Sequence, residues 1–229
     1  MALTRCGCRL WSAHGERMST AEQMRTPSPK GVLFDMDGVL VESTEAWFRV
    51  VEEAGRRFRG RAITRAEFDP TFGQGADADV SVFGLDVSPE ALDHFYFEEF
   101  PAHARETMWV NPEAAPLLQA LRARGLRLSV VTNTMARLAK VILDTAKLWD
   151  HFDAIVCADE VPHAKPAPDP LLEGCRRLSL STDEVWMIGD SRFDAEAAAA
   201  AGVWFVGMKR PGDARIDTLG SLEELLRAA

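Results

Sequence analysis

The chain has 229 residues, of which 47% are apolar and 27% are charged, an ordinary globular composition that excludes collagen-like and wholly disordered proteins. No apolar run approaches the roughly 18 residues that a membrane span needs, so we expect no membrane partner. The formal net charge of −9 would repel a phosphate backbone, which argues against a nucleic-acid partner.

Residues 1–30 differ in composition from the rest of the chain. They contain five basic and two acidic residues and no apolar run of the kind found in secretory signals. We expect either a disordered or transit-like extension, or a start codon placed upstream of the true start at Met18 or Met24. The Cys6 and Cys8 pair lacks a second pair of ligands at usable spacing, so no metal site is predicted there.

Short apolar runs typical of buried strands recur along the rest of the chain. Each is too short for a helix and lacks polar alternation, so both faces of the predicted sheet should be covered. These runs occupy residues 32–34, 128–131, 155–158, 185–188 and 203–206.

Helical patterns separate these strands. Asn111 is predicted to cap a helix with Pro112 at its first position, and a second helix is expected over residues 134–147. The alanine-rich stretch at residues 195–201 suits a helix that packs close to a sheet. Strands alternating with helices of this length predict an α/β fold, a doubly wound parallel sheet with a Rossmann-like core.

One long segment interrupts the alternation. Helices predicted at residues 45–59 and 89–105 belong to a small helical cap at residues 44–107, inserted after the first strand. The core domain would then comprise residues 31–43 and 108–229. Because open α/β sheets bind ligands at the carboxyl edge, we expect this cap to cover a site.

Two further features of the cap bear on its surface. The aromatic residues Phe95, Tyr96, Phe97 and Phe100 would supply more apolar surface than a small cap can bury, which leaves both a monomer and a homodimer open. The arginines are interpreted as a solvated helix face; they stand at positions 49, 56, 57, 59, 61 and 65.

Polar side chains follow the first two predicted strands at the points where these strands end. Asp35 and Asp37 follow the first strand, and their spacing of two residues points both side chains the same way on an extended backbone. Gly38 then permits a sharp turn. Thr132 and Asn133 offer a hydroxyl and free amides just before a helix, which is an arrangement suited to binding an anion.

The remaining polar motifs follow the third and fourth predicted strands. Lys165 lies in a proline-flanked loop, while Asp190 and Asp194 flank a turn. Four carboxylates converging with one lysine would repel one another unless a cation joined them. Oxygen ligands at a phosphate site suit Mg²⁺, so we predict that this cluster holds Mg²⁺ and, with Lys165, a dianionic phosphate.

Together these motifs resemble the four ordered motifs of the haloacid dehalogenase-like hydrolase superfamily. The matching segments are Asp35-Met36-Asp37-Gly38-Val39-Leu40, Thr132-Asn133, Lys165-Pro166 and Gly189-Asp190-Ser191-Arg192-Phe193-Asp194. The resemblance covers roughly residues 31–225, and the insertion is similar to the helical cap of its phosphoglycolate phosphatase and β-phosphoglucomutase group. Four motifs in this order, each at a strand end, are a specific signal, whereas any one alone is weak.

The resemblance implies a catalytic role for several residues. Asp35 would be the nucleophile that attacks phosphorus and forms an aspartyl-phosphate. Asp37 would protonate the leaving alkoxide and then activate the hydrolytic water. Thr132 and the Asn133 amide would bind the phosphoryl oxygens, and Lys165 would neutralise their charge.

The resemblance also implies a metal site. Mg²⁺ would be held by the carboxylates of Asp35 and Asp190 and by the backbone carbonyl of Asp37. Asp194 would orient Lys165 or a metal-bound water.

These roles imply an enzyme that acts on small phosphorylated metabolites. Dehalogenases of the superfamily need no Mg²⁺ and usually lack an acid two positions after the first aspartate, so Asp37 argues for a phosphatase. The best single substrate by analogy is 2-phosphoglycolate. The alternatives are a β-phosphoglucomutase-like phosphomutase and, third, a non-catalytic protein that binds phosphometabolites.

The cysteines indicate the compartment. Cys157 and Cys175 lie in apolar segments, and the spacing of the four cysteines forms no disulfide framework. We therefore expect reduced core cysteines and a cytoplasmic protein. Trp186 and Trp204 are expected in the core as well, and His163 in a structural or solvent-facing position.

Overall fold

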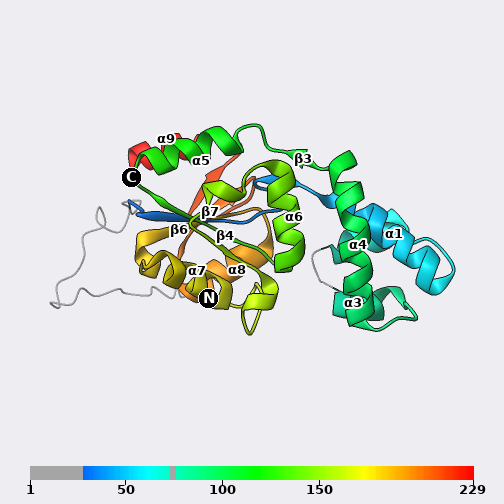
Figure 1. Ribbon diagram of the computed structural model, residues 1–229. Coiled ribbons are helices and arrows are strands. Elements are labelled where there is room, and N and C mark those ends of the chain that lie inside the picture. Colours follow the sequence, from blue (N-terminus) through cyan, green and yellow to red (C-terminus); the bar gives the residue numbers. More distant parts are fainter. Residues whose placement is uncertain (1–27, 73–75) are drawn as a thin grey trace, which may run out of the picture.

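A computed structural model describes residues 28–72 and 76–229 (Figure 1). Its main sheet has the strand order β5-β4-β1-β6-β7-β8, and every neighbouring pair is parallel. The bounds are β1 Gly31–Phe34, β4 Arg127–Val131, β5 Ala154–Val156, β6 Val185–Gly189, β7 Trp204–Met208 and β8 Ala214–Ile216. The predicted α/β fold with a parallel sheet is therefore confirmed, whereas the predictions for residues 1–27 lie outside the described residues.

The central strand β1 shows why the sheet is covered on both faces. Val32 and Phe34 pack into one apolar cluster, while Leu33 between them packs into another, as the two-residue period of a strand requires. All of these side chains are fully buried, and each such burial contributes about 1.5–3 kcal/mol. The carboxyl end of β1 is thus held rigidly, and with it the residue that follows.

Helices of the core cover the two faces of the sheet (Figure 1). On one face lie α5 Ala114–Ala123, α6 Ala136–Ala146 and α9 Ser221–Ala228, and on the other lie α7 Asp169–Leu178 and α8 Arg192–Ala201. The alanines of α8 allow it to pack directly on the sheet, where Ala197 and Ala198 are fully buried. Among the described residues, no helix is both long and apolar enough to cross a membrane.

The start of α5 corrects one prediction. Asn111 does not cap this helix, which begins three residues later at Ala114. The Asn111 side chain instead accepts a hydrogen bond from the Glu113 N–H at 3.0 Å and donates to the Val39 carbonyl at 3.1 Å. The asparagine therefore joins this turn to the loop after β1, a contact distant in sequence that no local pattern reveals.

The sheet edges differ from the predicted strands in two places. The strand expected at residues 155–158 ends at Val156, because the Cys157 N–H binds the Glu160 carboxylate at 2.9 Å and a 3₁₀ turn begins. Strand β8 was not predicted, since it is only three residues long and its central residue, Arg215, is exposed.

The inserted segment is helical and lies beyond the carboxyl end of β1 (Figure 1). It contains α1 Thr44–Arg59, α2 Arg65–Phe68, α3 Ala76–Phe83 and α4 Pro89–Thr107. Two short antiparallel strands, β2 Val41–Glu42 and β3 Trp109–Val110, form its connection to the core. Inside it, the rings of Trp47 and Phe100 lie 4.4 Å apart, so α1 and α4 share an aromatic core.

The expected surplus of apolar surface on α4 is not present. Phe95, Tyr96 and Phe100 are all buried within the helical segment. Phe97 is covered instead by the guanidinium group of Arg137 from α6, 3.8 Å from the ring centre. The aromatic side chains are covered within one chain because α4 packs against α1, α3 and α6. They therefore give no argument for a dimer.

Arg59 corrects the interpretation of the cap arginines as a solvated face. Its side chain is only 9% exposed. It donates to the carbonyls of Phe83 and Ala62 at 3.1 and 3.0 Å and pairs with Glu67 at 3.0 Å. This arginine therefore ties the end of α1 to α2 and α3.

Candidate active site

A buried ion cluster lies at the carboxyl edge of the sheet. The Lys165 ammonium group is 2.7 Å from Asp35 Oδ1 and 2.7 Å from Asp194 Oδ1, and it donates to the Val131 carbonyl at 2.8 Å. All three charged side chains are buried. The loop carrying Lys165 thus meets the ends of β1 and β4 and the start of α8.

Asn133 positions that lysine. Its side-chain amide donates to the Lys165 carbonyl at 2.8 Å and accepts from the Lys165 N–H at 2.9 Å. Both ends of the Asn133 side-chain amide are therefore occupied. The group of Asn133 that can bind a phosphoryl oxygen is its backbone N–H. The neighbouring Thr132 hydroxyl oxygen accepts from the Thr134 N–H at 3.0 Å, which leaves the hydroxyl proton free to be donated.

Asp37 is held by two hydroxyl groups that the sequence did not single out. Ser43 donates to one carboxylate oxygen, and Thr134 donates to the other at 3.4 Å. Desolvation nevertheless raises the pKa of Asp37 to about 6. In the sequence, the position of Ser43 just before a helix indicates only a residue that caps the helix. In the structure its side chain makes no capping hydrogen bond.

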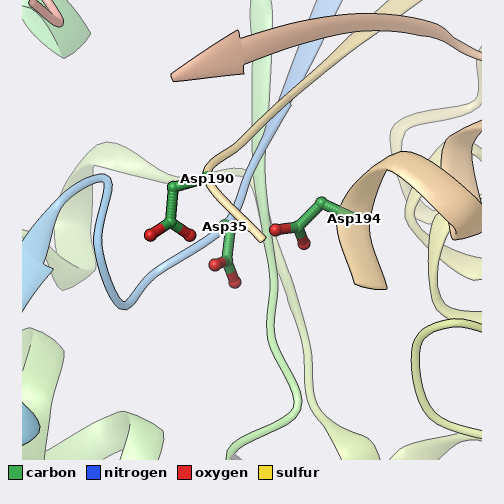
Figure 2. Close-up of side chains that lie close together, drawn as sticks. All are labelled: Asp35, Asp190 and Asp194. Atoms are coloured by element: carbon green, nitrogen blue, oxygen red, sulfur yellow. The ribbon is translucent and has the colours of Figure 1, made fainter. Parts of the chain in front are cut away.

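Asp35, Asp190 and Asp194 converge from different elements (Figure 2). Each can place a carboxylate oxygen within 4.8 Å of the others. Asp194 Oδ2 accepts from the Ser191 N–H at 3.0 Å and from its hydroxyl at 2.5 Å, so with Lys165 on its other oxygen it is fully engaged. Gly38 makes the convergence possible, because a side-chain carbon there would lie 2.0 Å from Asp190 Oδ2.

The cluster contains three carboxylates and, among the described residues, only one ammonium group, that of Lys165. Burial and the charge of Asp194 raise the pKa of Asp35 well above its ordinary value, although Lys165 opposes the shift. Desolvation, together with repulsion from the Asp194 charge, raises the pKa of Asp190 to about 6. Burial lowers the pKa of Lys165, but Asp194 and Asp35 outweigh it and keep the ammonium protonated. This set of crowded oxygen donors fits a divalent cation such as Mg²⁺.

A cavity of about 310 Å³ opens above the cluster, between the core and the helical segment. The structure brings the predicted site residues together there. Asp35, Asp37, Thr132, Asn133, Lys165 and Asp190 line the cavity, and Asp194 lies buried beneath Lys165. His163 is apart from them: its side chain is 74% exposed and its Nδ1 lies 3.2 Å from Asp169.

Asp79 of α3 also lines this cavity, and the sequence analysis missed it. It is 8% exposed, and Tyr96 donates a hydrogen bond to its Oδ2 at 2.8 Å. Burial raises its pKa to about 6. A lone acid on an otherwise apolar helix face was the only available signal, and such residues are usually solvated.

Replacing Asp79 with asparagine should make the protein more stable at pH 8. Because its folded pKa is raised to about 6 from an ordinary value of 3.8, Asp79 destabilises the folded state fully above pH 6, and this cost disappears only below its ordinary pKa. We expect Asp79→Asn to gain about 2 kcal/mol at pH 8 and less than half of that at pH 4.5. Urea unfolding of both proteins at the two pH values tests this, and an equal gain at both would contradict it.

Comparison with known proteins places these features in context. A family model described as haloacid dehalogenase-like hydrolase matches residues 32–208. The phosphoglycolate phosphatase of Nitrosospira multiformis is 32% identical over 189 residues, covering 78% of this chain and 83% of its own length. That of Escherichia coli is 30% identical over 207 residues, covering 78% and 81%.

A solved structure shows the same fold. CbbY from Rhodobacter sphaeroides, in complex with phosphate, superimposes with a TM-score of 0.77 at 22% identity, covering 85% of this chain and 96% of that one.

Proposed function

The chain belongs to the haloacid dehalogenase-like hydrolase family and is a phosphatase, and we propose that it hydrolyses small phosphate monoesters with Mg²⁺ through an aspartyl-phosphate (an acyl phosphate) at Asp35. The observation that carries this proposal is the position of Asp35. It is buried on the floor of the cavity, 2.7 Å from Lys165 and close to Asp190. The sequence resemblance, the family match and this geometry support the same assignment.

In the first step an Asp35 carboxylate oxygen attacks phosphorus and the bond from phosphorus to the substrate's alcohol oxygen breaks. Asp37 gives its proton to the departing alkoxide, and its pKa of about 6 keeps part of the population protonated near neutral pH. The Thr132 hydroxyl, the Asn133 N–H and the Lys165 ammonium group are the donors available to the phosphoryl oxygens.

In the second step water attacks the phosphorus of the aspartyl-phosphate. Asp37, now ionised, takes the water proton, inorganic phosphate leaves and the Asp35 carboxylate is regenerated. The hydroxyls of Ser43 and Thr134 keep the Asp37 carboxylate facing the cavity in both steps.

Mg²⁺ would be held by the carboxylates of Asp35 and Asp190 and by the Asp37 carbonyl, where it would supply positive charge to the phosphoryl oxygens. Asp194 is not assigned as a ligand, since its two oxygens already bind Lys165 and Ser191. We propose that it fixes the lysine instead.

Replacing Asp190 with asparagine should raise the Mg²⁺ concentration for half-maximal activity by at least about tenfold. The variant keeps the side-chain volume but loses the charge that faces the cluster. A Mg²⁺ titration of phosphate release measures the shift, and Asp183→Asn, which alters an exposed aspartate, is the control. An unchanged titration would remove Asp190 from the ligand set.

The helical segment at residues 44–107 is proposed to act as the cap that covers the site, since it supplies one wall of the cavity. A phosphomutase would need this wall to hold the second phosphate of a sugar bisphosphate. Among the described lining residues, Lys165 is the only lysine or arginine, and it belongs to the core. The structure therefore favours hydrolysis over the mutase alternative.

The experiment that tests the proposal is phosphate release from a panel of monoesters, with and without Mg²⁺. The names of the relatives make 2-phosphoglycolate the first compound to include, followed by hexose phosphates, nucleotides and pyrophosphate. We expect release that stops when the metal is chelated. A folded protein that releases no phosphate from any compound with Mg²⁺ present would favour the binding-protein alternative.

We propose a cytoplasmic location because the two described cysteines are reduced. Cys157 and Cys175 are both buried and free of disulfides, as expected in a reducing compartment.

A further inference from the structure

The cap end of the cavity is aromatic. Trp47 of α1, Phe68 of α2 and Tyr96 of α4 line it together with Phe72. The rings of Trp47 and Tyr96 meet edge to face, 5.8 Å apart at an interplanar angle of 82°; Tyr96 is 3% exposed and Trp47 is half-buried, so Trp47 offers the more accessible aromatic surface. The leaving group of a phosphate ester bound at Asp35 would extend toward these rings.

The same end of the cavity is acidic. Asp79 of α3 and Asp93 of α4 line it in addition to the carboxylates of the floor. Asp79 is 8% exposed, and the hydrogen bond from Tyr96 occupies one of its oxygens; its pKa is raised by burial. A nearby positive charge would offset this desolvation.

Among the described residues that line the cavity, no lysine or arginine comes from the cap. Lys165 is the only lysine or arginine among the described lining residues, and it is already engaged by Asp35 and Asp194. Burial and the charge of Asp77 raise the pKa of Asp93, and nearby Arg137 opposes this only in part. Arg137 does not line the cavity, and its guanidinium group is stacked on Phe97.

An aromatic ring beside a carboxylate can bind an ammonium group, through cation–π attraction and charge pairing. A substrate carboxylate at the same place would face Asp79 and Asp93 without a partner. We propose that the preferred substrates are phosphate monoesters of amino alcohols, whose ammonium group contacts the Asp79 oxygen that Tyr96 leaves free and the half-buried ring of Trp47. This inference rests on the proposed function and names its leaving group.

The test compares kcat/KM for choline phosphate with that for 3,3-dimethylbutyl phosphate, a neutral compound of the same shape. We expect the charged substrate to be favoured by about tenfold or more, and ethanolamine phosphate likewise to exceed 2-phosphoglycolate. In Asp79→Asn the preference should fall at least about threefold. Asp86→Asn, a change at an exposed cap aspartate, should retain the wild-type preference.

The outcomes separate this inference from the function on which it rests. Equal rates for the charged and neutral compounds, or 2-phosphoglycolate as the best substrate, would overturn the ammonium site and leave the phosphatase intact. Loss of the preference in Asp86→Asn to the same extent as in Asp79→Asn would also overturn it. Failure to hydrolyse any compound, including p-nitrophenyl phosphate, would overturn both proposals.

Discussion

Replacing Asp35 with asparagine is expected to lower phosphate release by at least about 10⁴-fold, the scale on which loss of a catalytic nucleophile acts, while the fold stays intact. The amide cannot attack phosphorus. Folding should not suffer, because burial and Asp194 already disfavour the ionised Asp35 and Lys165 keeps Asp194 as its partner.

Activity and thermal unfolding of Asp35→Asn should be measured on the same preparation. Asp217→Asn, which alters a carboxylate that is 71% exposed, serves as the matched control and should leave both quantities unchanged. Near-normal turnover in a folded Asp35→Asn protein would rule out the proposed nucleophile.

Replacing Lys165 with methionine is expected to abolish activity and to destabilise the protein by about 3–5 kcal/mol at pH 8, the range for breaking a buried ion pair. The lysine side chain is 3% exposed and touches two buried carboxylates. Without it, Asp35 and Asp194 would lose the ammonium group that both carboxylates contact. Lys140→Met is the control, since Lys140 is 56% exposed and its ammonium group contacts only the half-exposed Asp144 carboxylate and the face of Trp149 among the described residues.

The destabilisation of Lys165→Met should be smaller at low pH. Loss of the ammonium raises the pKa of the remaining carboxylates in the folded state, so the variant is penalised as pH rises through those values and relieved below them. Urea unfolding at pH 5 and pH 8 measures the difference. The same loss at both pH values would mean that packing of the lysine, and not its charge, is what the cluster needs.

Much of the site could be predicted because its residues follow strands. A buried strand has a short apolar run with a definite end, and Asp35, Thr132 and Asp190 each come within two residues of such an end. In a parallel sheet those ends share one edge, so local patterns were sufficient to bring these residues to one place.

The rest depends on contacts that local patterns do not encode. Asn133 binds the backbone of Lys165, 32 residues away, with both ends of its side-chain amide, and nothing in either segment indicates this pairing. Asp79 reaches the cavity only because α3 packs against α4, where Tyr96 binds it. Arg59 is buried by a turn and a helix that close over it.

Transfer of the phosphoryl group to Asp35 is tested most directly with Asp37→Asn and p-nitrophenyl phosphate. This leaving group departs without a proton, so the first step should proceed, whereas the second lacks its base. We predict a burst of one p-nitrophenolate per active site, followed by a stall, and borohydride reduction should convert Asp35 to homoserine. Steady turnover without a burst, or a label on another residue, would contradict the claim.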